Sequence, residues 1–365
     1  MAKNIPVSYL GEHKYNIHIR NDFEDLSSNL KELQLPAESK ICIVTDSNVE
    51  SLYLNAVMEE LKKNYPNIYS FSFPAGEQQK NLDTVQKLYE YLIVHHFDRK
   101  DYLLALGGAV VGDLTGFAAS TYLRGIPFIQ VPTTLLSQVD SSIGGKTGVD
   151  FMKYKNMVGA FYQPMMVYMN LNVLNTLDDA QFSAGMGEII KHSLIKNSKY
   201  FTWIKDNRDA ILAKDFETLE EMIYQSCLIK KYVVEVDPTE KGERALLNFG
   251  HTIGHAVEKL MNFGLLHGHC VAIGSVAAAY LSMKLGDITS ADYEEIKRVF
   301  ASFSLPITIQ KSPVSAADIL SATKSDKKME AGKIKFILLH AIGDAYITKE
   351  LTDDEIVKSI ESVLA

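Results

Sequence analysis

Two histidines, His251 and His255, stand four residues apart within residues 244–261. The apolar spacing predicts one helix here, and at about 100° per residue Arg244, Asn248 and both histidines fall within an arc of about 60°. Two imidazoles at this spacing can bind one metal ion, and the arginine and amide would suit a polar ligand beside it. The alternative is a pair of histidines that only make hydrogen bonds. The opposite face of the predicted helix is apolar and consists of Leu246, Phe249, Ile253, Val257 and Leu260.

Further metal donors lie elsewhere in the chain. His267 and His269 precede a long apolar run, and Glu188 follows a stretch of small residues. Two imidazoles and one carboxylate would leave zinc an open position for a substrate. We expect Gly250 and Gly254 to clear space around the neighbouring histidines. The spacing does not decide which three groups bind the metal, and Glu188 could instead pair with a basic residue on its own helix.

A glycine-rich turn indicates a phosphate site. Residues 107–113, Gly-Gly-Ala-Val-Val-Gly-Asp, follow a predicted strand and open a helix, whose first backbone N–H groups can bind a phosphate. The pattern differs from the dinucleotide fingerprint GxGxxG because Ala109 replaces the second glycine. Alternatively, these glycines bind no phosphate and only allow the strand and the helix to pack closely. Asp46 ends an earlier strand, where a carboxylate could bind ribose hydroxyls, and Gly76 with Glu77 follows another.

A second glycine-rich turn, Gly144-Gly145-Lys146-Thr147, resembles the end of a P-loop. A P-loop would require glycine at position 140, where this chain has Asp140, so the sequence excludes an ATPase of that type. A lysine flanked by glycines still suits an anion. Arg124 and Lys155 add positive charge nearby, although a solvated turn is the alternative.

The elements that must position these groups change character along the chain. Short β-rich runs alternate with helical patterns in the first half, which predicts βαβ units with a mostly parallel, Rossmann-like sheet that is covered on both faces. The predicted strands are 40–46, 69–73, 101–106 and 128–131, and the helical stretches between them are 48–64 and 81–95. From Asp178 the periodicity is helical. We therefore predict an α/β domain at 1–177 and an all-α domain at 178–365.

Composition narrows the possible functions. The chain has 365 residues, 47% of them hydrophobic and 22% charged, with a formal charge of −8. This charge argues against general binding to nucleic acid or to an anionic membrane, so an anionic substrate would need a local basic pocket. The longest apolar run, 270–283, is too short to span a bilayer and predicts a buried helix. The three cysteines are far apart, and no signal core is present, as expected for a cytoplasmic protein.

Several longer strings resemble the 3-dehydroquinate synthases. They cover much of the chain and comprise residues 112–119, 121–125, 130–136, 138–148, 155–161 and 244–251. The resemblance implies an N-terminal NAD-binding α/β domain, a C-terminal helical domain that binds metal and substrate, and a homodimer. It also implies Zn²⁺ or Co²⁺ bound by Glu188, His251 and His267, which leaves His255 on the substrate side.

The resemblance further implies two sets of binding residues. The sugar phosphate would contact Asp140, Lys146, Asn156, Lys191, Lys230, Arg244, Asn248 and His255, with Lys327 or Lys328 and with Arg124 reaching in from the partner subunit. Of these, the predicted catalytic residues are Lys146, Lys191, Lys230, Arg244, Asn248 and His255. NAD would contact Asp46, Gly76, Glu77, Lys80, Gly108, Ala109, Asp113, Thr133, Thr134, Lys146, Lys155 and Thr176.

Two positions depart from the family pattern. Ala109 replaces a usual glycine in the phosphate turn and adds only a methyl group. His269 replaces a usual glutamate two residues after a ligand histidine, where it could loosen His267 or offer a spare ligand. We expect activity to survive both changes.

The implied reaction converts 3-deoxy-D-arabino-heptulosonate 7-phosphate to 3-dehydroquinate and phosphate in the shikimate pathway, which leads to the aromatic amino acids. NAD is reduced, phosphate is eliminated, NADH returns the hydride, and an internal aldol step closes the ring. The alternatives are a sugar phosphate cyclase of the valiolone or scyllo-inosose synthase type, a metal-dependent polyol dehydrogenase, and a non-catalytic relative. The set Lys230, Arg244, Asn248 and His255 favours the dehydroquinate reaction.

Overall fold

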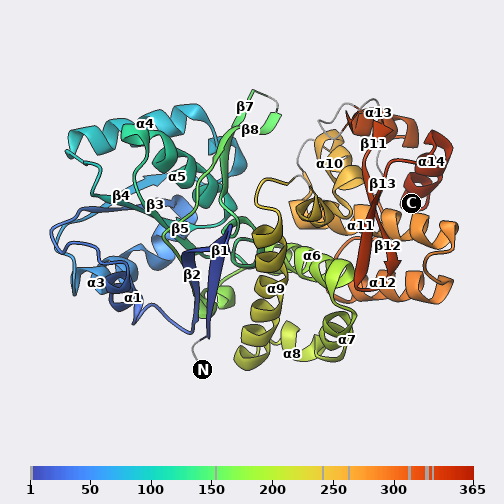
Figure 1. Ribbon diagram of the computed structural model, residues 1–365, viewed down its shortest axis with the longest axis horizontal. Helices are drawn as coiled ribbons and strands as arrows, with labels where there is room; N and C mark the ends of the chain where they lie inside the picture. The colour runs from blue at the N-terminus through green and yellow to red at the C-terminus, as the bar shows by residue number, and fades with distance from the viewer. Residues whose placement is uncertain are drawn as a thin grey trace. The chain divides into compact units, whose positions relative to one another are not determined.

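The computed structural model describes residues 3–152, 154–240, 242–261, 264–310, 314–324, 329–330 and 333–365. It divides into two compact units, residues 1–177 and 178–365, whose helices and strands are labelled in Figure 1. The first unit is built on a sheet and the second mainly on helices. Lys327 and Lys328, which the sequence analysis assigns to the substrate, lie outside the described residues.

The sheet of the first unit has seven strands in the order β1-β2-β9-β6-β5-β3-β4. Strand β1 runs antiparallel to β2, and every other pairing in this sheet is parallel. The strands are β1 (Lys3–Tyr9), β2 (Glu12–Arg20), β3 (Ile41–Asp46), β4 (Ile68–Phe73), β5 (Tyr102–Gly107), β6 (Phe128–Pro132) and β9 (Met166–Asn170). The predicted mostly parallel sheet is therefore confirmed.

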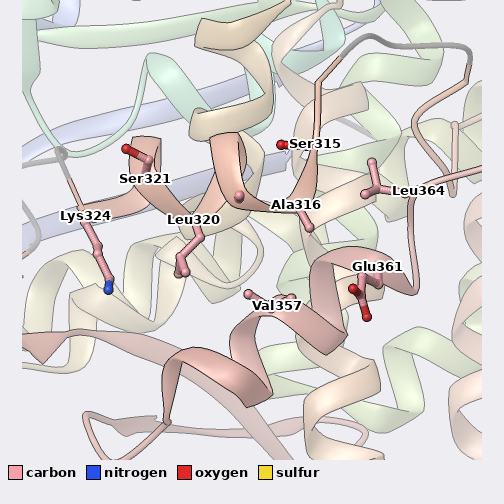
Figure 2. A pocket seen from close by; sticks show the side chains of 9 residues that line it. Ser315, Ala316, Leu320, Ser321, Lys324, Val357, Glu361 and Leu364 are labelled. Atoms are coloured by element: carbon pink, nitrogen blue, oxygen red, sulfur yellow. The ribbon is translucent and has the colours of Figure 1, made fainter.

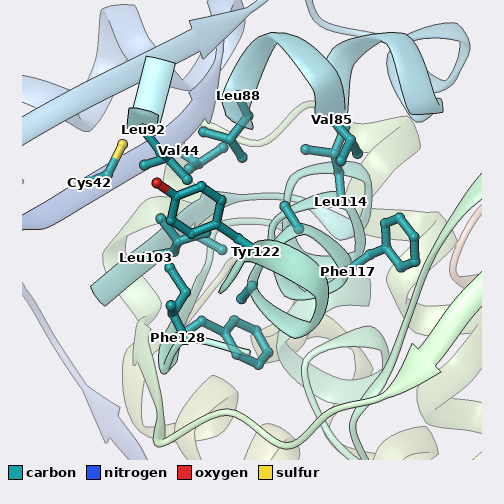
Figure 3. Packing of buried hydrophobic residues seen from close by; sticks show 14 of the residues in the cluster. Cys42, Val44, Val85, Leu88, Leu92, Leu103, Leu114, Phe117, Tyr122 and Phe128 are labelled. Atoms are coloured by element: carbon teal, nitrogen blue, oxygen red, sulfur yellow. The ribbon is translucent and has the colours of Figure 1, made fainter. Parts of the chain in front are cut away.

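Both faces of this sheet are covered. In β3, Cys42 and Val44 point into one hydrophobic cluster with helices α4 (Leu82–Val94) and α5 (Ala109–Thr121), as Figure 3 shows. Ile41 and Ile43 of the same strand belong to a second cluster, with α1 (Leu26–Glu32) and α3 (Asn55–Lys62). Successive side chains of a strand point to opposite faces, so a strand buried on both sides is apolar throughout.

Shorter elements follow the strands of the first unit. They are α2 (Ser47–Val49), the π-helical turn η1 (Glu50–Leu54), the 3-10 turns η2 (Glu77–Gln79), η3 (Tyr122–Arg124) and η5 (Leu171–Asn175), and the π-helical turn η4 (Ser137–Ser141). Strands β7 (Lys146–Phe151) and β8 (Tyr154–Phe161) form a separate antiparallel hairpin. Several of the predicted binding residues lie on these turns and at the ends of the parallel strands.

The second unit is mainly helical. Its helices are α6 (Asp179–Lys196), α7 (Ser198–Asp206), α8 (Arg208–Leu212), α9 (Phe216–Val236), the 3-10 turn η6 (Glu243–Asn248), α10 (His251–Leu260), α11 (His267–Leu285), α12 (Ser290–Ser302), α13 (Ala316–Lys324) and α14 (Asp353–Glu361). Helix α6 begins after Asp178, whose side chain accepts a hydrogen bond from Gln181 N. The predicted buried helix at 270–283 is confirmed as part of α11.

The prediction of an all-α second domain omitted two hairpins. Strands β12 (Phe336–Ala341) and β13 (Asp344–Thr348) pair antiparallel, with β12 against α11, and β10 (Met329–Glu330) pairs with β11 (Lys333–Ile334). A pocket between α13 and α14 (Figure 2) contains none of the predicted site residues. In the described part of the chain, no helix is both long and apolar enough to cross a membrane.

Candidate active site

Three potential metal donors of the second unit converge from three helices. Glu188 comes from the middle of α6, whereas His251 and His267 are the first residues of α10 and α11. Glu188 Oε1 lies 3.7 Å from His251 Nε2 and 3.5 Å from His267 Nε2. The two imidazole centroids are 5.3 Å apart. One carboxylate oxygen of Glu188 therefore faces a ring nitrogen of each histidine.

This donor set fits a divalent transition metal. Zinc binds imidazole and carboxylate at about 2.0–2.2 Å in tetrahedral geometry, which places neighbouring donor atoms about 3.4 Å apart. The separations from Glu188 Oε1 are close to that value. A nitrogen of His255 also lies within 4.8 Å of nitrogens of His251 and His267. Among the described residues, the three histidines could therefore hold an ion together, whereas the set Glu188, His251 and His267 is the one that the resemblance implies.

Glycines set how closely the three helices approach. A Cβ on Gly268 would lie 1.9 Å from Ala184 O, and one on Gly187 would lie 2.5 Å from Gly268 O, so α6 and α11 touch through their backbones next to Glu188 and His267. A Cβ on Gly254 would similarly lie 2.7 Å from Cys270 O. The expectation that Gly250 and Gly254 clear space around the histidines was therefore wrong, because they make room for the backbone of α11.

The predicted helix through residues 244–261 is broken. Arg244 and Asn248 lie on η6, and α10 starts only at His251. Between them Gly250 has φ of +77°, a left-handed conformation that L side chains rarely adopt. The helical-wheel arc that linked Arg244 and Asn248 to the histidines was thus wrong. The apolar residues Leu246, Phe249, Ile253 and Val257 are nevertheless buried.

The charged side chains around the proposed metal donor Glu188 are buried. Glu188 is fully buried and pairs with Lys191, one turn further along α6. His192 Nε2 lies 4.0 Å from Glu188 Oε2, and its Nδ1 contacts Ser226 Oγ at 2.8 Å. Glu188 therefore does pair with a basic residue on its own helix, in addition to facing the histidines. The ammonium of Lys191 on α6 then offsets the negative charge of Glu188.

Glu258 is a second carboxylate beside the proposed metal donors, and no sequence motif singled it out. Glu258 is buried, and its Oε2 lies 3.5 Å from His267 Nδ1. Burial lowers the pKa of His267, but Glu188 and Glu258 outweigh it and raise the pKa to about 9. Glu258 follows His251 by seven residues, so it lies on the same face of α10. That spacing was the available signal.

The other predicted substrate residues of the second unit lie on neighbouring elements. Lys230 is buried on α9, and Arg244 is buried on η6, where its guanidinium donates to Pro238 O at 2.6 Å. Asn248 Nδ2 donates to Glu240 Oε1 at 2.6 Å. Helices α6 and α9 both pack against η6. His269, which we expected to loosen His267 or to offer a spare ligand, contacts Ser183 Oγ on α6 with its Nε2 at 2.8 Å.

In the first unit, the phosphate turn opens a helix as predicted. Gly108 caps α5, so the first N–H groups of that helix follow directly on β5. A Cβ on Gly108 would lie 3.1 Å from Thr134 Cγ2, and Thr133 N donates to Gly107 O at 3.0 Å. Ala109 is the first residue of α5. The turn therefore presents backbone donors where the dipole of α5 favours an anion.

A buried ion pair stands beside this turn. Lys80 Nζ lies 2.6 Å from Asp113 Oδ2, and both groups are largely buried. Burial lowers the pKa of Lys80, but Asp113 and Glu77 outweigh it, so its pKa is raised and the ammonium is retained. Lys155 Nζ lies 3.4 Å from Glu77 Oε1. Four of the predicted NAD residues therefore contact one another in two ion pairs.

The remaining predicted NAD residues lie at strand ends or on turns. Asp46 ends β3 and accepts hydrogen bonds from Asn48 N and Val49 N at 2.9 and 3.0 Å. Gly76, three residues after the end of β4, has φ of +123°. Thr176 follows η5, and its hydroxyl contacts Tyr53. These positions agree with ligand binding outside the carboxyl ends of parallel strands.

The predicted substrate residues of the first unit lie on its turns and hairpin. Asp140 is on the π-helical turn η4, and Lys146 is the exposed first residue of β7. Asn156, on β8, has φ of +52°, and its N–H donates to Asp150 Oδ1 at 2.8 Å. Arg124 is exposed at the end of η3, also with positive φ, 72°.

Solved structures with the same fold include both cyclases and dehydrogenases. A 2-deoxy-scyllo-inosose synthase complexed with carbaglucose-6-phosphate, NAD⁺ and Co²⁺ superposes with a TM-score of 0.87 at 25% identity, over 100% of both chains. A 2-epi-5-epi-valiolone synthase from Streptomyces hygroscopicus subsp. jinggangensis, with NAD⁺ and Zn²⁺ bound, gives 0.87 at 25% identity over 98% of this chain and 99% of its own. Glycerol dehydrogenase from Schizosaccharomyces pombe shares the fold alone, with a TM-score of 0.66 at 16% identity over 94% and 88%. The two full-length matches at 25% identity place the chain in the class of sugar phosphate cyclases.

Sequence comparison identifies the family within this class. Residues 70–184 match the family model of the 3-dehydroquinate synthase N-terminal region, and residues 185–329 match that of the C-terminal region. The 3-dehydroquinate synthase of Desulforamulus reducens is 41% identical over 95% of this chain and 96% of its own length. That of Psychrobacter cryohalolentis is 45% identical over 85% and 84%. The chain belongs to the 3-dehydroquinate synthase family.

Proposed function

We propose that this protein converts 3-deoxy-D-arabino-heptulosonate 7-phosphate to 3-dehydroquinate and phosphate, with NAD and a divalent metal, Zn²⁺ or Co²⁺, as cofactors. The observation that carries the proposal is the convergence of Glu188, His251 and His267 from three helices in a chain of this family. Relatives named for this reaction are 40–45% identical to the chain, whereas the two cyclases that act on other substrates are 25% identical.

The proposed roles of the first unit concern NAD. The backbone N–H groups at the start of α5 would bind the pyrophosphate, with Gly108, Ala109, Thr133 and Thr134 lining the turn. The ammonium of Lys80 offsets the negative charge of Asp113 and Glu77 next to this turn. Asp46, Gly76, Lys146, Lys155 and Thr176 complete the proposed set.

The proposed roles of the second unit concern metal and substrate. When bound, the metal would polarise a substrate hydroxyl, and NAD would accept a hydride and later return it. Glu188, His251 and His267 would bind the ion, and His255 would move protons beside it. Lys191, Lys230, Arg244 and Asn248 would bind the anionic and hydroxyl groups of the sugar phosphate.

Charge supports this assignment of the cations. The chain carries a formal charge of −8, so attraction of an anionic substrate depends on local cations. Lys191, Lys230 and Arg244 are each at most 6% exposed, so water would compete little for an anion that they bind. Asp140 and Asn156 on the first unit complete the proposed substrate set, together with Lys327 or Lys328.

We further propose a homodimer in which Arg124 reaches the active site of the partner subunit, and a place in the shikimate pathway in the cytoplasm. The exposure of Arg124 at the end of η3 supports the first proposal, because such a side chain is accessible to a second copy. Burial of the three cysteines within β3, α9 and α11 agrees with a reducing compartment.

The test is incubation of purified protein with the heptulosonate phosphate, substoichiometric NAD and Zn²⁺, with phosphate and NADH followed together. We expect many moles of phosphate per mole of NAD and no accumulation of NADH, because each turnover returns the hydride. NADH formed one-to-one with product would indicate a polyol dehydrogenase and contradict the proposal. Turnover of sedoheptulose 7-phosphate or glucose 6-phosphate in place of the heptulosonate would indicate another cyclase.

A further inference from the structure

We propose that Glu258 is a positioning residue that holds His267 in the orientation and tautomer in which Nε2 binds the metal. The inference deepens the proposed function and rests on its metal site. Neither spacing nor the resemblance assigned a role to Glu258. It is not a ligand in this proposal, because it faces the nitrogen of His267 that points away from Glu188.

The two nitrogens of His267 face two different carboxylates. Nε2 lies 3.5 Å from Glu188 Oε1, on the side where the donors converge, and Nδ1 lies 3.5 Å from Glu258 Oε2. Glu258 is 4% exposed, so water competes little for its carboxylate. A neutral imidazole carries one N–H, and a carboxylate can only accept a hydrogen bond from it. When a metal takes the lone pair of Nε2, the one remaining N–H is on Nδ1, where Glu258 would accept a hydrogen bond from it.

The other ligand histidine is held in the same way by a different acceptor. His251 Nδ1 contacts Phe249 O at 3.1 Å, and its Nε2 lies 3.7 Å from Glu188 Oε1. Both imidazoles thus have Nδ1 directed at an acceptor and Nε2 directed at the shared carboxylate. Metal-bound histidines commonly have such an outer partner, which fixes the ring and raises its basicity.

Helix α10 combines two roles in this arrangement. His251 begins the helix as a proposed ligand, and Glu258 lies seven residues later on the same face. Helix α10 packs directly on α11, with Gly254 against Cys270 O. One helix therefore supplies a ligand and also supports the ligand that begins the next helix. A charged acceptor at His267 would make this imidazole the more basic of the two ligands.

The experiment measures metal affinity directly on the apo form of the full chain, by competition titration with a chelator for Zn²⁺ and by the visible absorption of added Co²⁺. Compared with wild type, we expect about 10-fold weaker binding for Glu258→Gln, whose amide oxygen still accepts a hydrogen bond, and about 100-fold for Glu258→Ala. The Co²⁺ bands should change in intensity in both variants, because a mobile imidazole alters the coordination geometry.

The matched control is Glu60→Gln in the first unit. Glu60 is also buried, at 5% exposure, and accepts a hydrogen bond from Ser27 Oγ at 2.7 Å. This variant should lose stability but keep the metal affinity and Co²⁺ spectrum of wild type. Equal loss of affinity in the control and the Glu258 variants would overturn the proposal in favour of general destabilisation.

The remaining outcomes separate this inference from the proposed function. Wild type that binds metal, with Glu258→Ala binding equally well, would overturn the role of Glu258 and leave the proposed function intact. If Glu258→Ala does not fold, the isosteric Glu258→Gln decides, and unchanged affinity and spectrum in that variant overturn the proposal. Wild type that binds neither ion would overturn both.

Discussion

Two regions depend on glycine in different ways. One is the helix crossing of α6, α10 and α11, which carries the metal donors, and the other is the phosphate turn at the carboxyl end of strand β5. At the helix crossing, Cβ atoms on Gly187, Gly254 and Gly268 would meet backbone carbonyl oxygens at 1.9 to 2.7 Å. In and beside the phosphate turn, Cβ atoms on Gly108 and Gly112 would meet the side chains of Thr134 and Gln130 at 3.1 and 2.7 Å.

The difference shows which of the two regions tolerates change. A side chain can rotate away from an added methyl group, whereas the backbone of a packed helix moves only with the whole helix. The metal donors keep their separations only while three helices keep their contacts, so they depend on packing throughout the second unit. The phosphate turn depends mainly on local backbone N–H groups, which agrees with alanine at position 109 at the start of α5.

The largest effect is expected from removing a donor at the helix crossing. His251→Ala should lose metal and turnover together, with turnover reduced by at least about 10³-fold, because a bound metal contributes several kcal/mol to the transition state. Metal content of the purified variant and phosphate release are the measurements. Normal zinc content with normal turnover would show that His251 is not a ligand.

The second-largest effect is expected from a substitution that disturbs helix packing but removes no metal ligand. Gly268→Ala should lower metal affinity by more than about 10-fold and the free energy of unfolding by about 3 kcal/mol, because its Cβ would lie 1.9 Å from Ala184 O. Chelator competition and urea unfolding measure the two quantities. Gly112→Ala in the first unit is the control, since its Cβ would meet the side chain of Gln130 rather than a backbone atom. Similar behaviour of the two variants would contradict the helix-contact argument.

Beside the phosphate turn, we expect a substitution to change NAD binding alone. Lys80→Met should raise the KM for NAD about 10-fold, because the cation beside the phosphate turn is lost and Glu77 remains there as a negative charge. Metal affinity should stay at the wild-type value. Lys63→Met, at an exposed lysine paired with Glu60, is the control and should leave the KM unchanged. A change in metal affinity without a change in KM would count against the role assigned to Lys80.

The smallest effect is expected from adding a methyl group beside a side chain. Gly112→Ala should change the free energy of unfolding by no more than about 1 kcal/mol, because Gln130 can move away and alanine favours the helix. The KM for NAD should change by less than about 3-fold. Urea unfolding and steady-state kinetics check both values. A loss as large as that of Gly268→Ala would remove the distinction between the two regions.

Much of the first unit could be predicted because its signals are local. Apolar runs bounded by glycine and polar turns located strands β3, β4, β5 and β6, and the turn at 107–113 was placed at the start of a helix. In the second unit, the buried helix at 270–283 was also found. The β12–β13 hairpin was missed, because its few alternating residues follow a long stretch of helical periodicity.

The break at Gly250 shows why periodicity was insufficient near the metal donors. The apolar spacing continues from Leu246 to Val257 although η6 ends before α10 begins, because buried positions can follow a helical period across a turn. Periodicity reports which side is buried and not the backbone φ of a single glycine. The positions of Arg244 and Asn248 relative to the histidines were therefore mispredicted.

By itself, the sequence determined strands β3, β4, β5 and β6, the residue types available for chemistry, and a set of candidate donors from which the resemblance selected Glu188, His251 and His267. The tertiary structure decided that Glu188 Oε1 lies within 3.7 Å of a nitrogen of each of these histidines, that Glu188 also pairs with Lys191, and that Glu258 faces the outer nitrogen of His267. The physical reason is that strand and helix patterns arise from neighbours in the chain. A metal site depends instead on where separate helices cross, and here backbone contacts at glycines set that crossing.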